Sequence, residues 1–407
     1  MKRRTMRKII GLGIEGKNLL PAAALLAAFL ALPQRSWGFD MAGPRSMGMG
    51  GAFVAACDDA TAVYWNPAAI TQIKGVEILP YAGARVTEEK VYDIVRDLEE
   101  WDDDHDPPYT LSEMKELKDI LERFNQSGVG VFGNASAGFA VATKWFALSS
   151  VALGQANLDP YADTELSHLG PTEADRARNR SRVDVNSLVT NNIALTLATT
   201  LGIPNLALGA NLKYIQAYRY TDRYYVFDQK TGEYADIDYE KRFNDNRVDG
   251  WGWGADAGAL VILGDYLRLG VLGRNLNEPR IDWEKRQPRT KLRNQFRAGA
   301  AIMPFKTLTL SLDADVTEQG REVIETRSGK RFKFDRTREV SAGLEWWLLR
   351  RHLALRGGVN NLTDGGSAGR FYTAGLGIRI PYLGFDLAGG YGEKRRYAAS
   401  VALSVRF

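Results

Sequence analysis

The clearest pattern in the chain is a strict two-residue alternation at its C-terminal end. One face of residues 397–407 carries Tyr397, Ala399, Val401, Leu403, Val405 and Phe407. The other face carries Ala398, Ser400, Ala402, Ser404 and Arg406. Successive side chains of a β-strand point to opposite faces, so this alternation predicts a strand with one apolar and one polar face. The same pattern recurs in residues 183–197 and 308–316.

The spacing of the strand-like runs predicts how they are connected. From Gly75 onward, short turns are expected near Lys144, Pro204, Asp265, Phe305, Arg350 and Tyr382. They alternate with longer links at 87–127, 159–182, 223–248, 275–290, 317–335, 363–369 and 392–395. A soluble sandwich would also alternate apolar and polar residues, but short turns opposite long loops are typical of outer-membrane barrels. We therefore predict an all-β fold, a transmembrane antiparallel β-barrel of about fourteen strands over residues 75–407.

Aromatic residues gather where the predicted strands end. They are Trp145, Phe146, Tyr266, Phe305, Trp346, Trp347 and Tyr382. Aromatic girdles mark the two interfaces of a membrane barrel. The chain also stops at Phe407 on a strand, which resembles the recognition signal of barrels inserted by the outer-membrane assembly machinery. The expected partners therefore include that machinery and the lipid bilayer of the outer membrane.

The first 38 residues have the form of a secretory signal peptide. Lys2, Arg3 and Arg4 precede an apolar stretch over residues 19–32, and small residues flank the expected cleavage site after Gly38. A retained anchor helix is the alternative, but the apolar stretch is shorter than the ~20 residues that a spanning helix needs. The predicted location is therefore the outer membrane of a Gram-negative bacterium.

Residues 39–74 separate the signal peptide from the first predicted strand. The segment is rich in glycine, and each interior glycine costs a helix roughly 1 kcal/mol relative to alanine. Asp58 and Asp59 can cap a turn, and Pro67 keeps Asn66 out of the helical region. Because an even number of strands returns the chain to the same side, the segment is expected to enter the lumen as a compact plug.

This segment also carries the motif that relates the chain to a known family. The motif consists of Arg45-Ser46-Met47-Gly48-Met49-Gly50-Gly51-Ala52-Phe53-Val54-Ala55, the pair Asp58-Asp59, and Asn66-Pro67-Ala68. It resembles the N-terminal hatch of the FadL/TodX outer-membrane hydrophobe transporters and of their PorV/PorQ-type and TraF-like relatives. The resemblance implies a hatch at 39–74 and passive uptake of hydrophobic molecules such as long-chain fatty acids. It also implies site roles: Phe39 and Asp40 beside the ligand pocket, Gly48, Gly50 and Gly51 for flexibility, and Asn66, Pro67 and Ala68 as the hatch anchor.

Two long links depart from the transporter pattern. The link at 87–127 shows helical spacing over residues 88–100 and a capping box from Thr110 to Glu113, which predicts a helical external insertion. The link that opens at Arg223 is charged and rich in tyrosine. The alternative function is therefore an accessory or assembly protein of PorV-like or TraF-like type, which binds an exported protein partner rather than lipid.

Composition and charge narrow the functional classes to which the protein can belong. The net charge of +4 is small and evenly mixed, which does not indicate nucleic-acid binding. The alternation of side chains along each strand also predicts which charged residues face the lumen, and their signs nearly balance. The acidic ones are Asp184, Asp256, Asp313, Asp315, Glu339, Glu345 and Asp386, and the basic ones are Lys213, Arg268, Arg274, Arg293, Arg297, Arg356, Arg379 and Arg406. This balance disfavours a charge-selective porin and fits structural ion pairs to a plug. With one cysteine, Cys57, and three scattered histidines, the sequence contains no metal-ligand spacing and no nucleophile motif. No catalytic residue, metal or cofactor is expected, and we predict a non-enzyme.

Overall fold

The structure is a computed structural model of the whole chain. It describes residues 42–105, 109–126, 128–170, 172–200, 205–284, 289–317, 324–325, 331–332, 338–362, 369–393 and 395–407. The predicted signal peptide, residues 1–38, and the predicted pocket residues Phe39 and Asp40 lie outside this part of the chain.

Fourteen antiparallel strands form a closed ring. In ring order they are β1 (Glu77–Glu89), β2 (Gly130–Ala142), β3 (Phe146–Tyr161), β4 (Arg182–Thr199), β5 (Leu206–Tyr225), β6 (Arg247–Leu263), β7 (Leu267–Arg274), β10 (Gln295–Phe305), β11 (Leu308–Asp315), β14 (Glu339–Leu348), β15 (Leu353–Leu362), β16 (Arg370–Ile380), β17 (Leu383–Gly392) and β18 (Arg396–Arg406). The ring closes where β1 pairs with β18, with Glu77 opposite Arg406. This confirms the predicted barrel and its number of strands.

The apolar face of each strand points outward. On β11, Leu310 and Leu312 expose 42% and 54% of their surface, whereas Ser311 and Asp313 are buried. β17 and β18 repeat the pattern, with Phe385 and Leu403 exposed but Asp386 and Ser404 buried. A soluble barrel would bury its apolar side chains instead, so the outer surface has the pattern of a barrel that contacts hydrocarbon.

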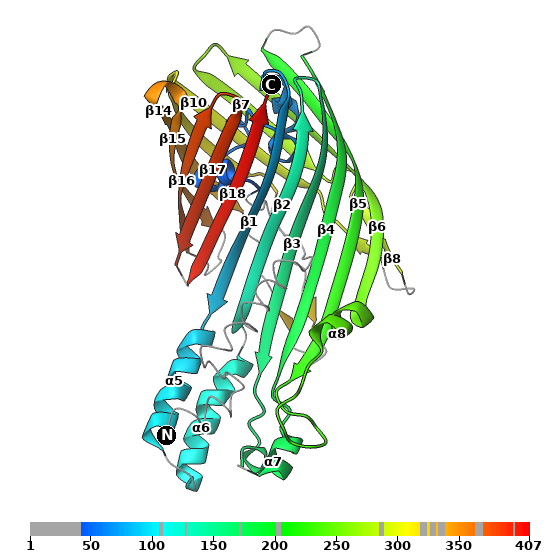
Figure 1. Cartoon of the computed structure of the whole chain (residues 1–407), viewed down its shortest axis with the longest axis vertical. Coiled ribbons are helices and arrows are strands. Elements are labelled where there is room, and N and C mark those ends of the chain that lie inside the picture. The colour runs from blue at the N-terminus through cyan, green and yellow to red at the C-terminus, as the bar shows by residue number, and fades with distance from the viewer. Residues whose placement is uncertain are drawn as a thin grey trace.

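The connections alternate between the two ends of the barrel, as predicted (Figure 1). Short turns join the strands at one end, here called the short-turn end, where β18 also finishes. The other end, here called the long-link end, carries the remaining elements. These are α5 (Val91–Asp104), α6 (Leu111–Glu122), η3 (Arg123–Asn125), η4 (Leu166–His168), α7 (Glu173–Arg178), α8 (Tyr239–Asn246), β8 (Arg280–Trp283), β9 (Thr290–Lys291), β12 (Ile324–Glu325) and β13 (Arg331–Phe332). A further one-turn helix, η5 (Leu349–Arg351), lies in a short turn.

Helices α5 and α6 form a hairpin that projects beyond the strands (Figure 1). The capping box predicted at Thr110 is present, because its hydroxyl accepts from the Glu113 amide and the Glu113 carboxylate accepts from the Thr110 amide. Ile94, Leu98 and Leu117 belong to a small buried cluster of the hairpin. The two apolar faces therefore pack on each other. No helix among the described residues has the length and apolar character needed to cross a membrane.

The ring has two unequal halves. Strands β3 to β6 contain between 16 and 20 residues each, and β1 and β2 contain 13 each. The strands from β7 to β18 that belong to the ring contain only 8 to 11 residues each. We call β1–β6 the tall half and β7–β18 the short half. The tall half extends much farther toward the long-link end (Figure 1).

Residues 42–74 lie inside the ring, and we call them the inner segment. They form α3 (Pro44–Gly48), α4 (Ala62–Trp65) and η2 (Pro67–Gln72). α3 contacts β15 to β18, whereas η2 contacts β4 to β6 on the other side of the ring. Phe53, Trp65 and Ile70 are fully buried in a cluster with apolar side chains of the wall. The inner segment therefore spans the lumen near the short-turn end (Figure 1).

Candidate functional site

The inner segment is tied to the short half by one buried arginine. The guanidinium of Arg45 on α3 donates to both carboxylate oxygens of Glu345 on β14, at 3.0 and 2.8 Å. It also donates to Asp58 and Asp59 of the inner segment, each at 2.8 Å. Bidentate pairing of this kind fixes orientation as well as position. Arg45 therefore joins the start and the middle of the inner segment to the barrel wall.

The ion pairs continue from Glu345 across the wall. Glu345 accepts from Arg356 on β15 at 2.7 Å, and Arg356 lies 2.8 Å from Asp386 on β17. Asp386 also pairs with Arg379 at 2.6 Å. Burial alone would favour the neutral form of Arg45, but the carboxylates of Glu345, Asp58 and Asp59 outweigh it and raise the pKa of Arg45. These three carboxylates therefore keep Arg45 in its charged form.

A second contact in the short half uses backbone amides. The Asp313 carboxylate on β11 accepts from the amides of Phe53 and Val54, both at 2.8 Å. Arg297 on β10 reaches from the same wall to the Gly51 carbonyl at 3.0 Å. Two amides on one carboxylate oxygen make a strong charge-assisted contact. This contact fixes the chain directly after the glycine-rich motif.

Asn66 makes the contact to the tall half. Its amide nitrogen donates to the carbonyls of Val54 and of Ala259 on β6, each at 3.1 Å. Its side-chain oxygen accepts from the Ala68 amide at the start of η2. Pro67 suits this first position because the amide nitrogen of proline carries no hydrogen and its φ is already helical. Asn66 therefore connects two parts of the inner segment to the wall.

Glycines in the wall let the inner segment approach its backbone closely. A Cβ added to Gly358 on β15 would overlap the backbone of Met49 and Gly50, and one added to Gly258 on β6 would overlap the Asn66 side chain. Gly50 itself has a φ of 64°, which favours glycine. Glycine within a strand often marks such a close backbone approach. The glycines of the motif and of the wall therefore let the two backbones pack directly against each other.

The structure brings together most of the residues that the motif predicts. Gly48, Gly50, Gly51, Asn66, Pro67 and Ala68 are all buried between the inner segment and the wall. Their roles in flexibility and anchoring stay predictions. Sequence reasoning named Arg45 only as part of the motif and missed its four contacts. An arginine among glycine, alanine and methionine was the available signal, since a buried cation needs a carboxylate partner.

The structure confirms the structural interpretation of the lumen charges. Glu345, Asp313, Arg297, Arg356 and Arg379, all predicted to face the lumen, form ion pairs or hold the inner segment. Arg293 is the exception, because it lies after β9 in the link to β10 rather than on a strand of the ring.

An open chamber lies beside the inner segment in the tall half. The space between its walls is about 780 Å³, a volume that includes open solvent. Val63 and Tyr64 of the inner segment line one side. The apolar part of the wall consists of Val151, Leu153, Leu188, Ala194 and Leu292. The polar part includes Ser149, Asn211, Lys213, Asp256, Arg274 and Asn275.

The charged groups of the chamber hold each other and the inner segment. Lys213 on β5 lies 2.6 Å from Asp256 on β6. Asn211 donates to Asp256 at 3.0 Å and to the Val63 carbonyl at 2.8 Å. Arg274 donates to the Tyr64 carbonyl at 2.9 Å. The chamber therefore offers an apolar surface beside a compact polar one with two cations and one anion.

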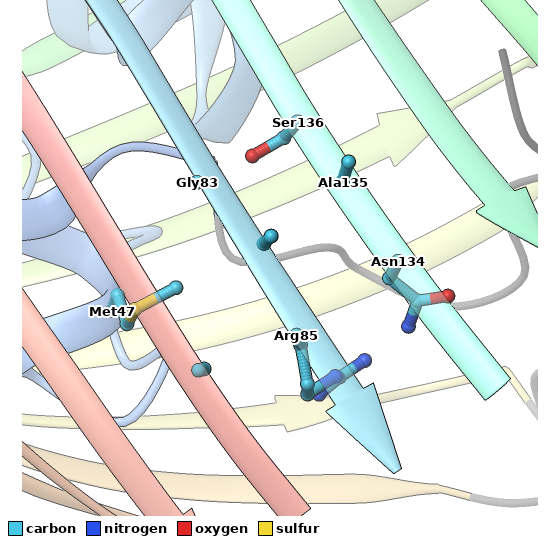
Figure 2. A pocket seen from close by; sticks show the side chains of 8 residues that line it. Met47, Gly83, Arg85, Asn134, Ala135 and Ser136 are labelled. Atoms are coloured by element: carbon cyan, nitrogen blue, oxygen red, sulfur yellow. The ribbon is translucent and has the colours of Figure 1, made fainter. Parts of the chain in front are cut away.

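A second, smaller pocket lies against the wall between β1, β2 and β18. Figure 2 shows Gly83 and Arg85 on β1 and Asn134 and Ser136 on β2, with Met47 of the inner segment nearby. Its lining is built mostly from small side chains. Within the described residues, no group of three or more His, Cys, Asp or Glu side chains is placed to hold a metal ion.

The fold and its lumen define a class: an antiparallel β-barrel with an apolar outer face and an N-terminal segment packed inside. More than half of the chain, residues 63–315, matches the family described as F plasmid transfer operon, TraF, protein. The chain belongs to this family. No curated protein sequence matches it.

Several solved structures share the fold. A Pseudomonas aeruginosa FadL homologue is 12% identical, with a TM-score of 0.55, and the match covers 92% of this chain and 100% of that one. The Ralstonia pickettii toluene transporter TbuX is 13% identical, with a TM-score of 0.54 and coverage of 91% and 99%. The CymD monoaromatic hydrocarbon channel is 14% identical, with a TM-score of 0.55 and the same coverage. At these identities the likeness establishes the fold.

Proposed function

We propose that the protein is an outer-membrane barrel for passive uptake of small hydrophobic molecules. Long-chain fatty acids are the cargo that fits the chamber by its chemistry. In this proposal the inner segment acts as a hatch, and cargo leaves the chamber when the hatch rearranges. The observation that carries the proposal is the chamber, enclosed by the tall half and by Val63 and Tyr64 of the inner segment.

The outer surface supports a location in the outer membrane. Large apolar side chains are exposed around the ring, as with Leu269, Leu344 and Ile378. Exposed Trp145, Phe305 and Tyr382 lie at short turns, where an aromatic girdle is expected. In a closed ring the backbone N–H and C=O groups of each strand can bond to a neighbouring strand. This matters in a bilayer, because hydrocarbon offers these groups no hydrogen-bond partner. These features are those of a barrel that spans a bilayer.

The two surfaces of the chamber support an amphipathic cargo. The alkyl chain of a fatty acid would contact Val151, Leu153 and Leu188, because burying apolar surface is favourable by about 25 cal/mol per Å². Its carboxylate would lie near Lys213 and Arg274, which together outnumber the one carboxylate of Asp256. A pure hydrocarbon would offer no anionic group to Lys213 or Arg274.

Uptake into liposomes tests the proposal. The purified barrel is reconstituted in vesicles that contain a fatty-acid-binding fluorescent reporter, and the entry of hexadecanoate is followed over time. We expect faster entry than into vesicles with an unrelated barrel of similar size. Leu153→Trp should reduce the entry rate several-fold by filling the chamber, whereas Leu403→Trp on the outer face should not. Entry at the control rate would contradict the proposal.

The α5–α6 hairpin favours a second candidate, an accessory that binds an exported protein. The hairpin has its own buried cluster and projects beyond the barrel (Figure 1). α5 carries seven acidic residues and one arginine. A barrel that only takes up small molecules has no evident need for such a projection. Co-purification of one exported protein, lost when residues 91–122 are replaced by a short linker, would favour this function over uptake.

A further inference from the structure

The smaller pocket, between β1, β2 and β18, contains one positively charged side chain, Arg85. This side chain runs from β1 toward Asn134 on β2 (Figure 2). With the Asn134 amide oriented to satisfy both of its polar atoms, its oxygen accepts from Arg85 at 2.8 Å and its nitrogen donates to the Gly133 carbonyl at 3.0 Å. A guanidinium carries several N–H donors, and this contact uses only one of them.

Arg85 differs from other lumen arginines in its lack of a carboxylate partner. Within the described part of the chain, no Asp or Glu side chain forms an ion pair with it. Arg45, Arg297, Arg356 and Arg379 are each paired with a carboxylate. Arg85 is partly buried, and ion pairs at partly buried positions are screened much less than exposed ones. The group that complements Arg85 is therefore an anion supplied from outside the chain.

Small side chains give such an anion room to approach. Gly83, Ser136 and Ala398 line the pocket around Arg85. The space between the walls is about 280 Å³, a volume that includes open solvent. Met47 of the inner segment lines the pocket as well and belongs to a buried cluster. None of the described residues that line the pocket is acidic. The pocket therefore suits a small anionic head group.

The register of the strands places this pocket beside the chamber. Ser136 lies opposite Gly83 on β1 and opposite Leu153 on β3, and Leu153 lines the chamber. Neighbouring strands are about 4.8 Å apart, so β1 lies roughly 10 Å from β3 along this row. Gly83 and Ser136, which lie between Arg85 and the chamber, are small. A long alkyl chain whose head group binds Arg85 can therefore reach the apolar surface at Leu153.

The cations of the chamber have competing partners. Lys213 pairs with Asp256 at 2.6 Å and donates to the Asn275 side chain at 3.0 Å. Arg274 donates to the Tyr64 carbonyl. A carboxylate that approaches Lys213 also meets the negative charge of Asp256, which lines the same chamber. A carboxylate at Arg85 meets no acidic side chain in the lining of its pocket.

We propose that the Arg85 pocket is a head-group site, which binds the carboxylate of a long-chain amphiphile whose alkyl chain extends past Ser136 into the chamber. The guanidinium suits this role because its fork of donors matches the two oxygens of a carboxylate. Asn134 holds the guanidinium in place, and Met47 brings the inner segment into contact with the bound molecule.

This site deepens the proposed uptake function, on which it rests for the class of cargo. It gives the cargo carboxylate a second place in the lumen, separate from Lys213 and Arg274. We expect Arg85 to hold the carboxylate more tightly, because no acidic side chain of its pocket opposes the binding.

Equilibrium binding tests the site. Radiolabelled hexadecanoate and hexadecanol, which share an alkyl chain but differ in charge, are bound to the purified barrel in detergent. Arg85→Gln removes the charge but keeps a side chain that can bond to Asn134. We expect it to weaken hexadecanoate binding at least tenfold and to leave hexadecanol binding unchanged. Arg85→Lys, which keeps the charge, should weaken hexadecanoate binding less than Arg85→Gln does.

The matched control is Arg395→Gln, which removes an arginine that pairs with Glu88 and Asp93 outside the pocket. It should bind both ligands as the unchanged protein does. Equal hexadecanoate binding by the unchanged protein and by folded Arg85→Gln would overturn the head-group site and leave the uptake proposal in place. No hexadecanoate binding by the unchanged protein would overturn both.

A second measurement needs no substitution. Phenylglyoxal reacts with accessible guanidinium groups, and peptide mass spectrometry follows the modification of Arg85 in the unchanged barrel. We expect hexadecanoate to slow this modification several-fold and hexadecanol to leave it unchanged. Modification that neither ligand slows, or that both slow equally, would show that no carboxylate binds Arg85 and would overturn the proposal.

Discussion

The short half of the barrel holds the inner segment through several buried charges. The tall half holds it through neutral contacts to carbonyl groups and through one carboxylate, Glu77 on β1, which accepts from the Ala60 amide at 2.8 Å, and it leaves a chamber beside the segment. In the short half, Glu345 and Asp313 receive Arg45 and two backbone amides. In the tall half, Asn66 and Asn211 make neutral hydrogen bonds to carbonyl groups. Charge-assisted contacts are roughly twice as strong as neutral ones.

This difference indicates which side of the inner segment would stay fixed during the proposed uptake. Breaking a buried ion pair is costly because it leaves an uncompensated charge. The neutral contacts of Asn66 and Asn211 cost less to break and are replaceable by water or cargo. We therefore expect a rearranging hatch to pivot on the short half and to open beside the tall half.

Of the substitutions that test this comparison, Glu345→Ala is expected to weaken the attachment of the inner segment most. The change leaves Arg45 and Arg356 without their shared carboxylate, a loss of about 3–5 kcal/mol for a broken buried pair. We expect the inner segment to detach and ion conductance across planar bilayers to rise strongly. Arg395→Ala removes an ion pair on the barrel exterior, to Glu88 and Asp93, and should leave conductance unchanged. Unaltered conductance in Glu345→Ala would mean that the charges do not hold the segment.

Gly358→Ala should have the next largest effect. Its new Cβ would overlap the backbone of Met49 and Gly50, which cannot move away as a flexible side chain can. We expect faster proteolysis of the inner segment in a barrel that still resists unfolding in detergent. Gly357→Ala is a matched control on the same strand, because its Cβ would lie 3.9 Å from the nearest atom, on Leu344. Equal proteolysis of the two variants would show that close approach is unimportant.

Asn66→Ala tests the neutral contacts that hold the inner segment to the tall half. It removes two donors from carbonyl groups, at a cost of about 1–3 kcal/mol for buried groups left unpaired. Permeability to hydrophobic solutes should rise, by less than Glu345→Ala raises conductance, and the barrel should stay heat-modifiable in gel electrophoresis. Uptake equal to that of the unchanged protein, with an intact barrel, would argue against Asn66 as an anchor.

The smallest expected effect is that of pH on the stability of the α5–α6 hairpin. Hydrogen bonds from Arg123 and Arg96 lower the pKa of Asp97, which joins α5 to the end of α6. Because the folded pKa is lowered, this contact stabilises the hairpin above the ordinary aspartate pKa of about 4 and loses its effect as the pH falls through the lower folded value. Hydrogen exchange in α5 should speed up slightly below that pH. Asp97→Asn should abolish this dependence, and a dependence that persists would assign it to another group.

The architecture was predictable because its signals are local. The alternation of residues 397–407 and the spacing of short turns and long links depend only on neighbouring residues, and both correctly predicted the fourteen strands. The capping box at Thr110 likewise lies within four residues.

The contacts inside the lumen were not predictable in the same way. Arg45 and Glu345 are 300 residues apart, so their pairing follows only from the closed ring. The alternation of side chains along each strand correctly placed Glu345, Asp313 and Arg356 in the lumen. It could not predict which of them would contact the inner segment. The chamber depends on side chains from β3 to β7 together with a link that folds back over them.

The most direct test of a cargo chamber maps where cargo binds. Hexadecanoic acid with a photoreactive diazirine on its alkyl chain is added to the purified barrel, irradiated, and located by peptide mass spectrometry. We expect unlabelled hexadecanoate to prevent labelling of peptides that contain Val63, Leu153 or Leu188, the apolar surface of the chamber. Labelling confined to the outer apolar face, for example at Leu312 and Phe385, would contradict a cargo chamber in the tall half.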